Sequence, residues 1–208
     1  MSFLEDKCSL SLLENPEEIE GFSCGDSDLD DFFNNYCFDY AKELLGKTYC
    51  FKVDEYPHQI VCAFTLANAG VRVSDMPNAR KKKIEANIPH IKSLKDYPAI
   101  LVARLGVSKD FRSLHIGSDA LSYIKLWMIG PFNKTGCRFI IVDAYNELET
   151  ISFYENNGFR AVFSTEQQEK EYRHINYDMP LSTRLLFYDL MHTAKEYQGR
   201  NTDSFLQP

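Results

Sequence analysis

The chain has 208 residues, of which 44% are hydrophobic and 25% are charged. This size and composition are typical of one packed domain with an insertion or a tail. The formal net charge of -7 argues against a surface built mainly to hold nucleic-acid backbone, which needs a basic face. Residues 1–21 carry acidic groups and no continuous apolar run, so we expect no signal peptide, no membrane anchor and a cytoplasmic location.

The six cysteines are scattered along the chain. They form no Cys-x-x-Cys pair and have no histidines at zinc-ligand spacing, so the sequence predicts no metal site. A secreted disulfide scaffold is normally short and dense in cysteine, and this chain is neither. We therefore expect reduced thiols that act as small buried apolar groups. The residues are Cys8, Cys24, Cys37, Cys50, Cys62 and Cys137.

Apolar residues at steps of three and four predict a first helix between Leu29 and Leu44. Ser27 or Asp28 can cap its start, and Gly46 can end it.

Two β-rich stretches follow, at residues 48–53 and 59–66, with a polar hairpin turn between them. Residues 73–98 then shift to Pro, Asn and the basic run Arg80-Lys81-Lys82-Lys83, which predicts an inserted short helix and loop. Because the whole chain is acidic, we interpret this run as a solvated helix face rather than a nucleic-acid contact.

A long apolar strand at residues 99–107 leads into a polar segment and then into a helix that includes Leu121 and Ile124. Gly106, near the end of this strand, predicts a bulge or a close backbone approach. The order of strand, polar loop with glycine, and helix exposes backbone N–H groups at the positive end of a helix dipole. The sequence therefore predicts an anion site here, into which a pyrophosphate would fit.

The C-terminal half predicts a strand at 137–144, a helix at 147–156 and a strand at 158–163. Residues 183–190 suit either a last strand or the start of a helix that runs to Tyr197, and we favour the strand. Residues 198–208 are expected to form a flexible tail. The resulting fold is α/β, with a mixed sheet and one right-handed crossover.

Two motifs carry a family resemblance. Val-Ala-Arg-Leu-Gly-Val at 102–107 is followed by Arg112-x-x-His115-x-Gly117, and residues 142–146 are followed by Phe-Tyr-Glu-Asn-Asn-Gly-Phe at 153–159. In this order and at this spacing they resemble the acetyl-CoA motifs of GNAT N-acetyltransferases. The segment from Phe22 to Phe33 is also similar to the GNAT branch that includes the toxins of toxin–antitoxin pairs.

The resemblance covers most of residues 22–190. It implies the GNAT fold, a mixed central sheet of six to seven strands flanked by helices, as one domain over residues 1–197 with the insertion at about 73–98.

The resemblance also implies how the site would be used. Backbone N–H groups near Leu105 to Val107 would hold the pantetheine arm and the thioester carbonyl oxygen of acetyl-CoA, and the following loop would hold the pyrophosphate. Tyr154 would be the general acid that protonates the departing thiolate. The implied cofactor-binding residues are Leu105, Gly106, Val107, Lys109, Arg112, Ser113, Leu114, His115, Ile116, Gly117, Ser118 and Asn146.

His115 departs from the family pattern, which has a glycine at this position. Glycine lets the backbone approach the pyrophosphate. The His115 side chain must therefore point away from the phosphates or supply a hydrogen bond of its own.

We expect an N-acetyltransferase that transfers an acetyl group from acetyl-CoA to a primary amine of a small molecule or a protein. One alternative is a toxin that acetylates aminoacyl-tRNA, which the N-terminal similarity and the basic run at 80–83 favour and the net charge opposes. The other is a non-catalytic acyl-CoA-binding module, which the presence of Tyr154 opposes. Asp143, the five histidines and a water chain remain open as the general base, and a homodimer remains open as the assembly.

Other reaction classes lack their motifs. The sequence has no G-x-S-x-G elbow, no Walker loop and no H-E-x-x-H pair, which excludes the common hydrolase, NTPase and zinc-peptidase chemistries.

Overall fold

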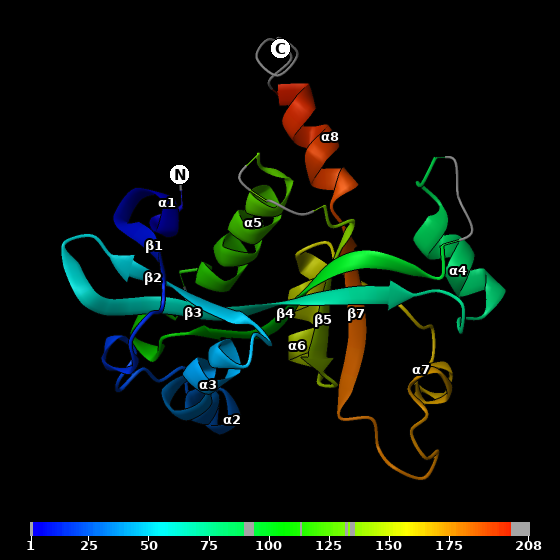
Figure 1. The fold of residues 1–208 in the computed structure, drawn as a ribbon, viewed down its shortest axis with the longest axis horizontal. Helices are drawn as coiled ribbons and strands as arrows, with labels where there is room; N and C mark the ends of the chain where they lie inside the picture. The colour runs from blue at the N-terminus through cyan, green and yellow to red at the C-terminus, as the bar shows by residue number, and fades with distance from the viewer. Residues whose placement is uncertain (1, 90–93, 113, 132, 134–135, 201–208) are drawn as a thin grey trace. The chain divides into compact units, whose positions relative to one another are not determined.

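A computed structural model describes residues 2–89, 94–112, 114–131, 133 and 136–200 (Figure 1). Within these residues seven strands form one mixed sheet in the order β1-β2-β3-β4-β5-β7-β6. The strands are β1 (Cys8–Leu12), β2 (Lys47–Val53), β3 (Tyr56–Arg72), β4 (Asp96–Val107), β5 (Phe139–Tyr145), β6 (Arg160–Ala161) and β7 (Thr183–Asp189).

Helices flank the sheet, as the α/β prediction requires. They are α1 (Phe3–Lys7), α2 (Ser27–Asp31), α3 (Cys37–Lys42), α4 (Asn78–Glu85), α5 (Ile116–Ile129), α6 (Leu148–Asn156), α7 (Glu166–Arg173) and α8 (Met191–Arg200), with the shorter turns η1 (Pro16–Glu18), η2 (Phe32–Tyr36) and η3 (Lys109–Phe111).

The chain divides into two compact units. Unit 1 comprises Met1–Asn68 and Leu101–Ile124, and unit 2 comprises Ala69–Ile100 and Lys125–Pro208.

The helical segment of unit 1 differs from the single helix predicted between Leu29 and Leu44. A π-helical turn, η2, separates α2 from α3. Asp26 caps the start in place of Ser27 or Asp28, because its carboxylate accepts the N–H groups of Asp28 and Leu29. Fully buried Phe33 packs edge-on against Phe22, with ring centroids 5.5 Å apart.

The predicted hairpin in unit 1 is confirmed. β1 pairs antiparallel with β2, and β2 pairs antiparallel with β3. β1, which the sequence did not predict, begins at Cys8 opposite Val53.

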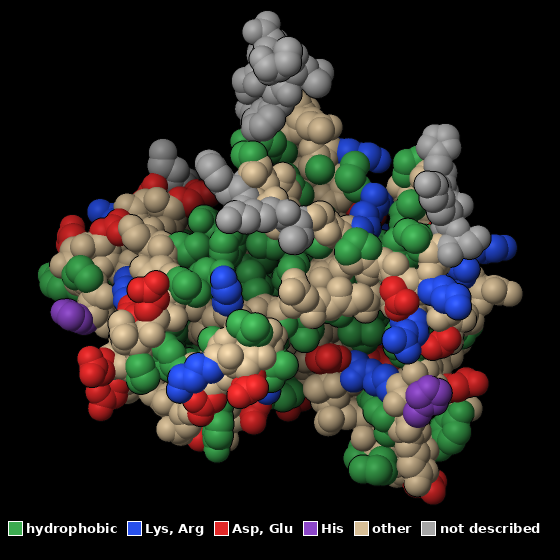
Figure 2. All heavy atoms as spheres, in the orientation of Figure 1, with side chains coloured by type: hydrophobic (Ala, Val, Ile, Leu, Met, Phe, Trp, Pro, Cys, Tyr) green, Lys and Arg blue, Asp and Glu red, His purple; other side chains and the backbone are tan. Residues whose placement is uncertain are grey.

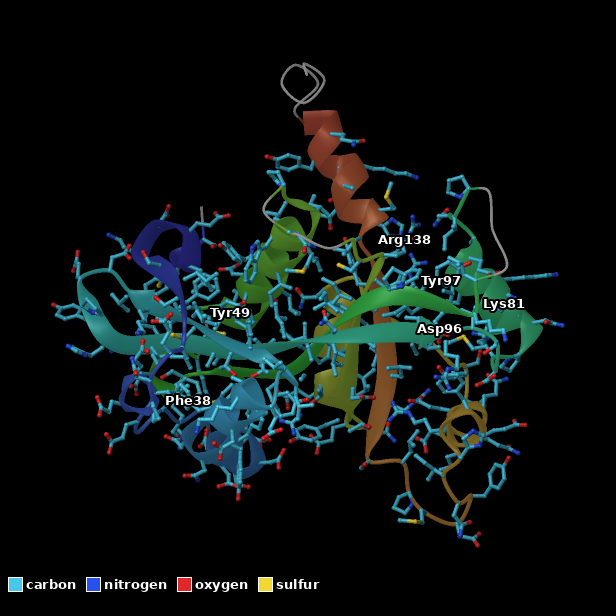
Figure 3. The ribbon with its side chains drawn as sticks, viewed as in Figure 1. Phe38, Tyr49, Lys81, Asp96, Tyr97 and Arg138 are labelled. Carbon is cyan, nitrogen blue, oxygen red and sulfur yellow. The ribbon has the colours of Figure 1, made fainter. Side chains whose placement is uncertain are left out.

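The short helix predicted in residues 73–98 is confirmed as α4, which lies beside the end of β3 and the start of β4 in unit 2 (Figure 1). Its base is held by polar contacts: the Tyr97 hydroxyl donates to buried Glu85 at 3.0 Å, and Arg138 donates to the Asn87 carbonyl at 3.2 Å. Figure 3 shows Tyr97 and Lys81 on this side of the unit.

The strand predicted at 158–163 is shorter in the structure, where β6 spans only Arg160–Ala161, because Glu169 ends its pairing with β7. The Val162 N–H donates to the Leu185 carbonyl at 2.9 Å, but the Leu185 N–H donates to the Glu169 carboxylate at 2.6 Å. A side chain thus takes the place of the next strand residue, and pairing stops. Glu169 is 0% exposed and also pairs with Arg173 at 2.8 Å and Arg184 at 2.7 Å.

The predicted strand near the C-terminus is confirmed as β7, and α8 follows it directly (Figure 1). Residues 198–200, predicted as part of a tail, belong to α8, and residues 201–208 lie outside the described residues. All six cysteines are free; four are buried, as expected, whereas Cys8 and Cys137 are half-buried. Among the described residues, no helix has the length and hydropathy needed to cross a membrane.

Candidate functional site

The end of β4 packs closely against the N-terminal helical segment within unit 1. A Cβ atom on Gly106 would lie 3.0 Å from Cε2 of Phe33 and 3.2 Å from both Cβ and Sγ of Cys24. The predicted close approach at Gly106 is therefore confirmed, and a side chain here would require Phe33 and Cys24 to shift by a few tenths of an ångström. Leu105 and Val107 flank this glycine at the last positions of the strand.

The loop after β4 is fixed by hydrogen bonds to its neighbours in unit 1. The Ser108 N–H donates to the Val61 carbonyl at 2.9 Å, and the Lys109 N–H donates to the Ser23 carbonyl at 3.1 Å. Arg112 Nη2 donates to the Cys24 carbonyl at 2.6 Å. Since a guanidinium carries five N–H donors, Arg112 is anchored by one group and keeps others for a ligand.

The start of α5 has the geometry of an anion site. His115 has a φ of 56°, the left-handed conformation that glycine adopts most easily, and its carbonyl accepts the N–H groups of Ser118 and Asp119 at 3.0 and 3.1 Å. Among the described residues, the N–H groups of Ile116 and Gly117 have no hydrogen-bond acceptor. These donors lie at the positive end of a 14-residue helix.

Three loop residues contribute less to this picture. Lys109 lines a cavity of about 240 Å³ whose other charged residues are Glu18, Glu20 and Asp110, so its surroundings favour a structural role. Leu114 is exposed, and Ser113 lies outside the described residues. Contact of these three with a cofactor stays a prediction.

Tyr154 lies on α6 in unit 2 between two aromatic rings. Its ring centroid is 5.0 Å from that of Phe153 and 5.5 Å from that of Phe159. Burial raises the pKa of Tyr154 to about 12, so the hydroxyl keeps its proton at neutral pH. No described residue forms a hydrogen bond with this hydroxyl, which leaves it free to donate to a ligand.

Lys125, which the sequence analysis did not single out, anchors the end of α6. It is 8% exposed, its Nζ donates to the Asn157 carbonyl at 2.6 Å, and it lies 4.2 Å from the ring centroid of Tyr188. Burial lowers the pKa of Lys125 to about 8. The available signal was its position four residues after Leu121, on the apolar face of the helix.

Asn146 and Asp143 are both engaged within unit 2. The Asn146 side-chain amide donates to Glu166 and to the Leu181 carbonyl, each at 2.9 Å, so only its oxygen remains for a ligand. Asp143 forms an ion pair with Arg173. These contacts favour structural roles, and cofactor binding by Asn146 stays a prediction.

Comparison with known proteins identifies the fold. Neither a family model nor a curated protein matches the sequence. Solved structures match almost the entire chain: a mutant of KacT has a TM-score of 0.67 at 17% identity, covering 92% of this chain and 99% of that one. The chain has the GNAT fold. AtaT complexed with acetyl-methionyl-tRNAfMet has a TM-score of 0.67 at 14% identity, covering 91% and 99%, and AtaTR bound with AcCoA has a TM-score of 0.64 at 16% identity, covering 92% and 99%.

The GNAT fold predicted from the two motifs is thus confirmed, and so is the similarity to its toxin branch. The donors at the start of α5 suit an anion such as a pyrophosphate, because two backbone N–H groups and the remaining Arg112 donors have no acceptor among the described residues. No group of three metal-ligating side chains occurs in the part of the chain that the structure describes.

Proposed function

We propose that the chain is an acetyl-CoA-dependent N-acetyltransferase that acts on the amino group of aminoacyl-tRNA, as a toxin. One observation carries this choice over the small-molecule or protein amine expected first: the fold matches AtaT complexed with acetyl-methionyl-tRNAfMet over 91% of this chain. The matched AtaTR structure bound with AcCoA supports acetyl-CoA as the acetyl donor. A matched AtaT mutant is bound to the C-terminus of the antitoxin AtaR, so we include a protein antitoxin among the proposed partners.

The proposed reaction needs few protein groups. Acetyl-CoA, when bound, supplies an acetyl group activated as a thioester. The neutral amine attacks the carbonyl carbon, a C–N bond forms, and the C–S bond breaks with its electron pair passing to sulfur. The hydroxyl of Tyr154 gives its proton to that sulfur, and the nitrogen releases its own proton to water or to a base.

Two features of Tyr154 support this role. Its pKa is raised to about 12 by burial, so at neutral pH the hydroxyl carries the proton that a donor needs. Its two aromatic neighbours fix the ring, which limits the positions that the hydroxyl can take. A ring held in place with a free hydroxyl is what proton donation in a shielded site requires.

The backbone supplies the remaining functions in this proposal. The N–H groups of Ile116 and Gly117, with Arg112, hold the pyrophosphate. The strand end at Leu105 to Val107 holds the pantetheine arm and stabilises the carbonyl oxygen as it gains charge. The conformation of His115 keeps the backbone in the shape that the family's glycine provides.

Replacing Tyr154 with phenylalanine tests the proposal. We expect Tyr154→Phe to lower turnover on methionyl-tRNA by about a hundredfold or more, the usual scale for a lost proton donor, with unchanged binding of coenzyme A. Labelled acetyl transfer and calorimetry measure the two quantities. Tyr177→Phe is the matched control, because Tyr177 is an exposed tyrosine on the surface of unit 2.

Each competing function gives a different result. Growth arrest on expression of the wild type, relieved by Tyr154→Phe, supports the toxin. Acetylation of small amines or proteins with none of aminoacyl-tRNA would restore the first expectation. Binding of coenzyme A without transfer to any amine would indicate a binding module.

A further inference from the structure

Unit 2 contains a cavity of about 670 Å³ lined by four cationic side chains from three elements. Arg80 and Lys83 come from α4, Arg160 from β6 and Arg184 from β7. The volume falls in the usual range of ligand pockets. Figure 2 shows Lys and Arg side chains gathered over the region of α4, with Asp and Glu side chains among them.

The basic run at 80–83 is therefore more than a solvated helix face. Residues three apart share one side of a helix, so Arg80 and Lys83 both line the cavity, while Lys81 and Lys82 do not. The chain thus gathers positive charge at one place although its net charge is -7. A local basic site can bind an anionic partner even when the whole chain is acidic.

Two of the four cations have no partner among the residues that the structure describes. Arg184 pairs with Glu169, and Lys83 Nζ donates to the Ala161 carbonyl at 3.1 Å. The side chains of Arg80 and Arg160 form no hydrogen bond or ion pair with any described residue.

The cations also repel one another. Burial lowers the pKa of Lys83, and the charges of Arg80 and Arg160 lower it further. Of the described lining residues, only Glu155 adds negative charge. A bound anion would offset this repulsion.

We infer that this cavity binds a phosphate group of the acceptor nucleic acid through the guanidinium groups of Arg80 and Arg160. The inference rests on the proposed function. A phosphate presents several oxygens that converging cations from separate elements can contact together, whereas one guanidinium fork already satisfies a carboxylate. Arg160 is exposed and Arg80 half-buried, so a continuing backbone can enter and leave past them.

Paired double variants test the inference. Arg80→Ala with Arg160→Ala removes two charges from the cavity, and Lys81→Ala with Lys82→Ala removes two from the same region without touching the lining. We expect the cavity variant to bind tRNA about a hundredfold more weakly, about tenfold for each lost charge-assisted contact, and the control to change by less than about threefold. The slope of log affinity against log salt should fall by about two in the cavity variant.

The source of the phosphate is distinguished with two probes. Inorganic phosphate and an oligoglutamate peptide are titrated against the wild type and both variants. Loss of binding for either probe in the cavity variant, with unchanged tRNA affinity, would overturn the inference in favour of a free phosphate or an acidic peptide. Equal losses of tRNA affinity in both double variants would overturn it in favour of diffuse charge attraction.

Measuring affinity in the Tyr154→Phe background separates this inference from the proposed function, since binding then needs no turnover. Acetylation of tRNA by the wild type, with equal tRNA affinity in wild type and cavity variant, would refute the phosphate site and leave the enzyme intact. A wild type that neither binds nor acetylates tRNA would refute both.

Discussion

Replacing Lys125 with methionine tests the energetics of the end of α6. Lys125 is 8% exposed and has a pKa lowered to about 8, against 10.5 for a free lysine. Between these values the unfolded chain holds the proton more tightly than the folded one, so this residue makes stability rise with pH. One pKa unit corresponds to about 1.4 kcal/mol. Between about pH 7 and about pH 9.5, the free energy of unfolding of the wild type should therefore rise by about 2 kcal/mol relative to that of Lys125→Met.

The comparison needs the matched variant because other groups titrate in the same window. Burial raises the pKa of several cysteine thiols, among them Cys50 to about 12. These thiols lower the free energy of unfolding as the pH rises above their pKa in the unfolded chain. They are the same in both proteins, so urea unfolding of each at a series of pH values isolates Lys125. A constant difference between wild type and variant across this range would refute the reasoning.

Two further predictions concern single side chains. His115→Gly should raise the melting temperature by about 2–4 °C, because a left-handed non-glycine residue costs about 1–2 kcal/mol. Glycine removes this strain, although its larger loss of backbone entropy on folding offsets part of the gain. His115→Ala should not raise the melting temperature, and scanning calorimetry measures both variants. Glu169→Ala should lower the free energy of unfolding by about 3–5 kcal/mol, because Arg184 and the Leu185 N–H lose the carboxylate that accepts their hydrogen bonds. Glu171→Ala on the same helix should lower it by less than about 0.5 kcal/mol. A similar loss for both variants in urea unfolding would contradict this account.

The sequence predicted those elements whose apolar period is long and uninterrupted. Strand β4, helix α5 and helix α6 were predicted because their residues repeat with a clear period and are bounded by polar or glycine residues. Strand β1 and helix α7 were not predicted. β1 is short, and α7 is strongly polar, with the charged Glu169 as its one buried residue. Periodicity cannot show an element that tertiary ion pairs hold in place.

The candidate site divides in the same way. The motifs around Tyr154 and the start of α5 could be predicted because they encode local geometry, and the structure adds that His115 has a left-handed φ. Lys125 and Arg160 were missed, and Arg80 was noted only as part of the basic run, because the contacts of Lys125 and the placing of Arg80 and Arg160 at one cavity depend on chain segments far apart in the sequence. The π-helical turn η2 likewise has no pattern in the sequence that separates it from an ordinary helix.

Glu169 has a consequence for association between molecules. A strand edge with bare N–H and C=O groups invites a strand from another chain, which is a first step toward domain swapping and aggregation. β6 pairs with two residues of β7, Leu186 and Phe187, so the preceding stretch of β7 would present such an edge. The Glu169 carboxylate occupies the Leu185 N–H and holds Arg184 beside it. A foreign strand would have to displace a doubly paired charge before it could dock, so this margin of the sheet is protected against self-assembly.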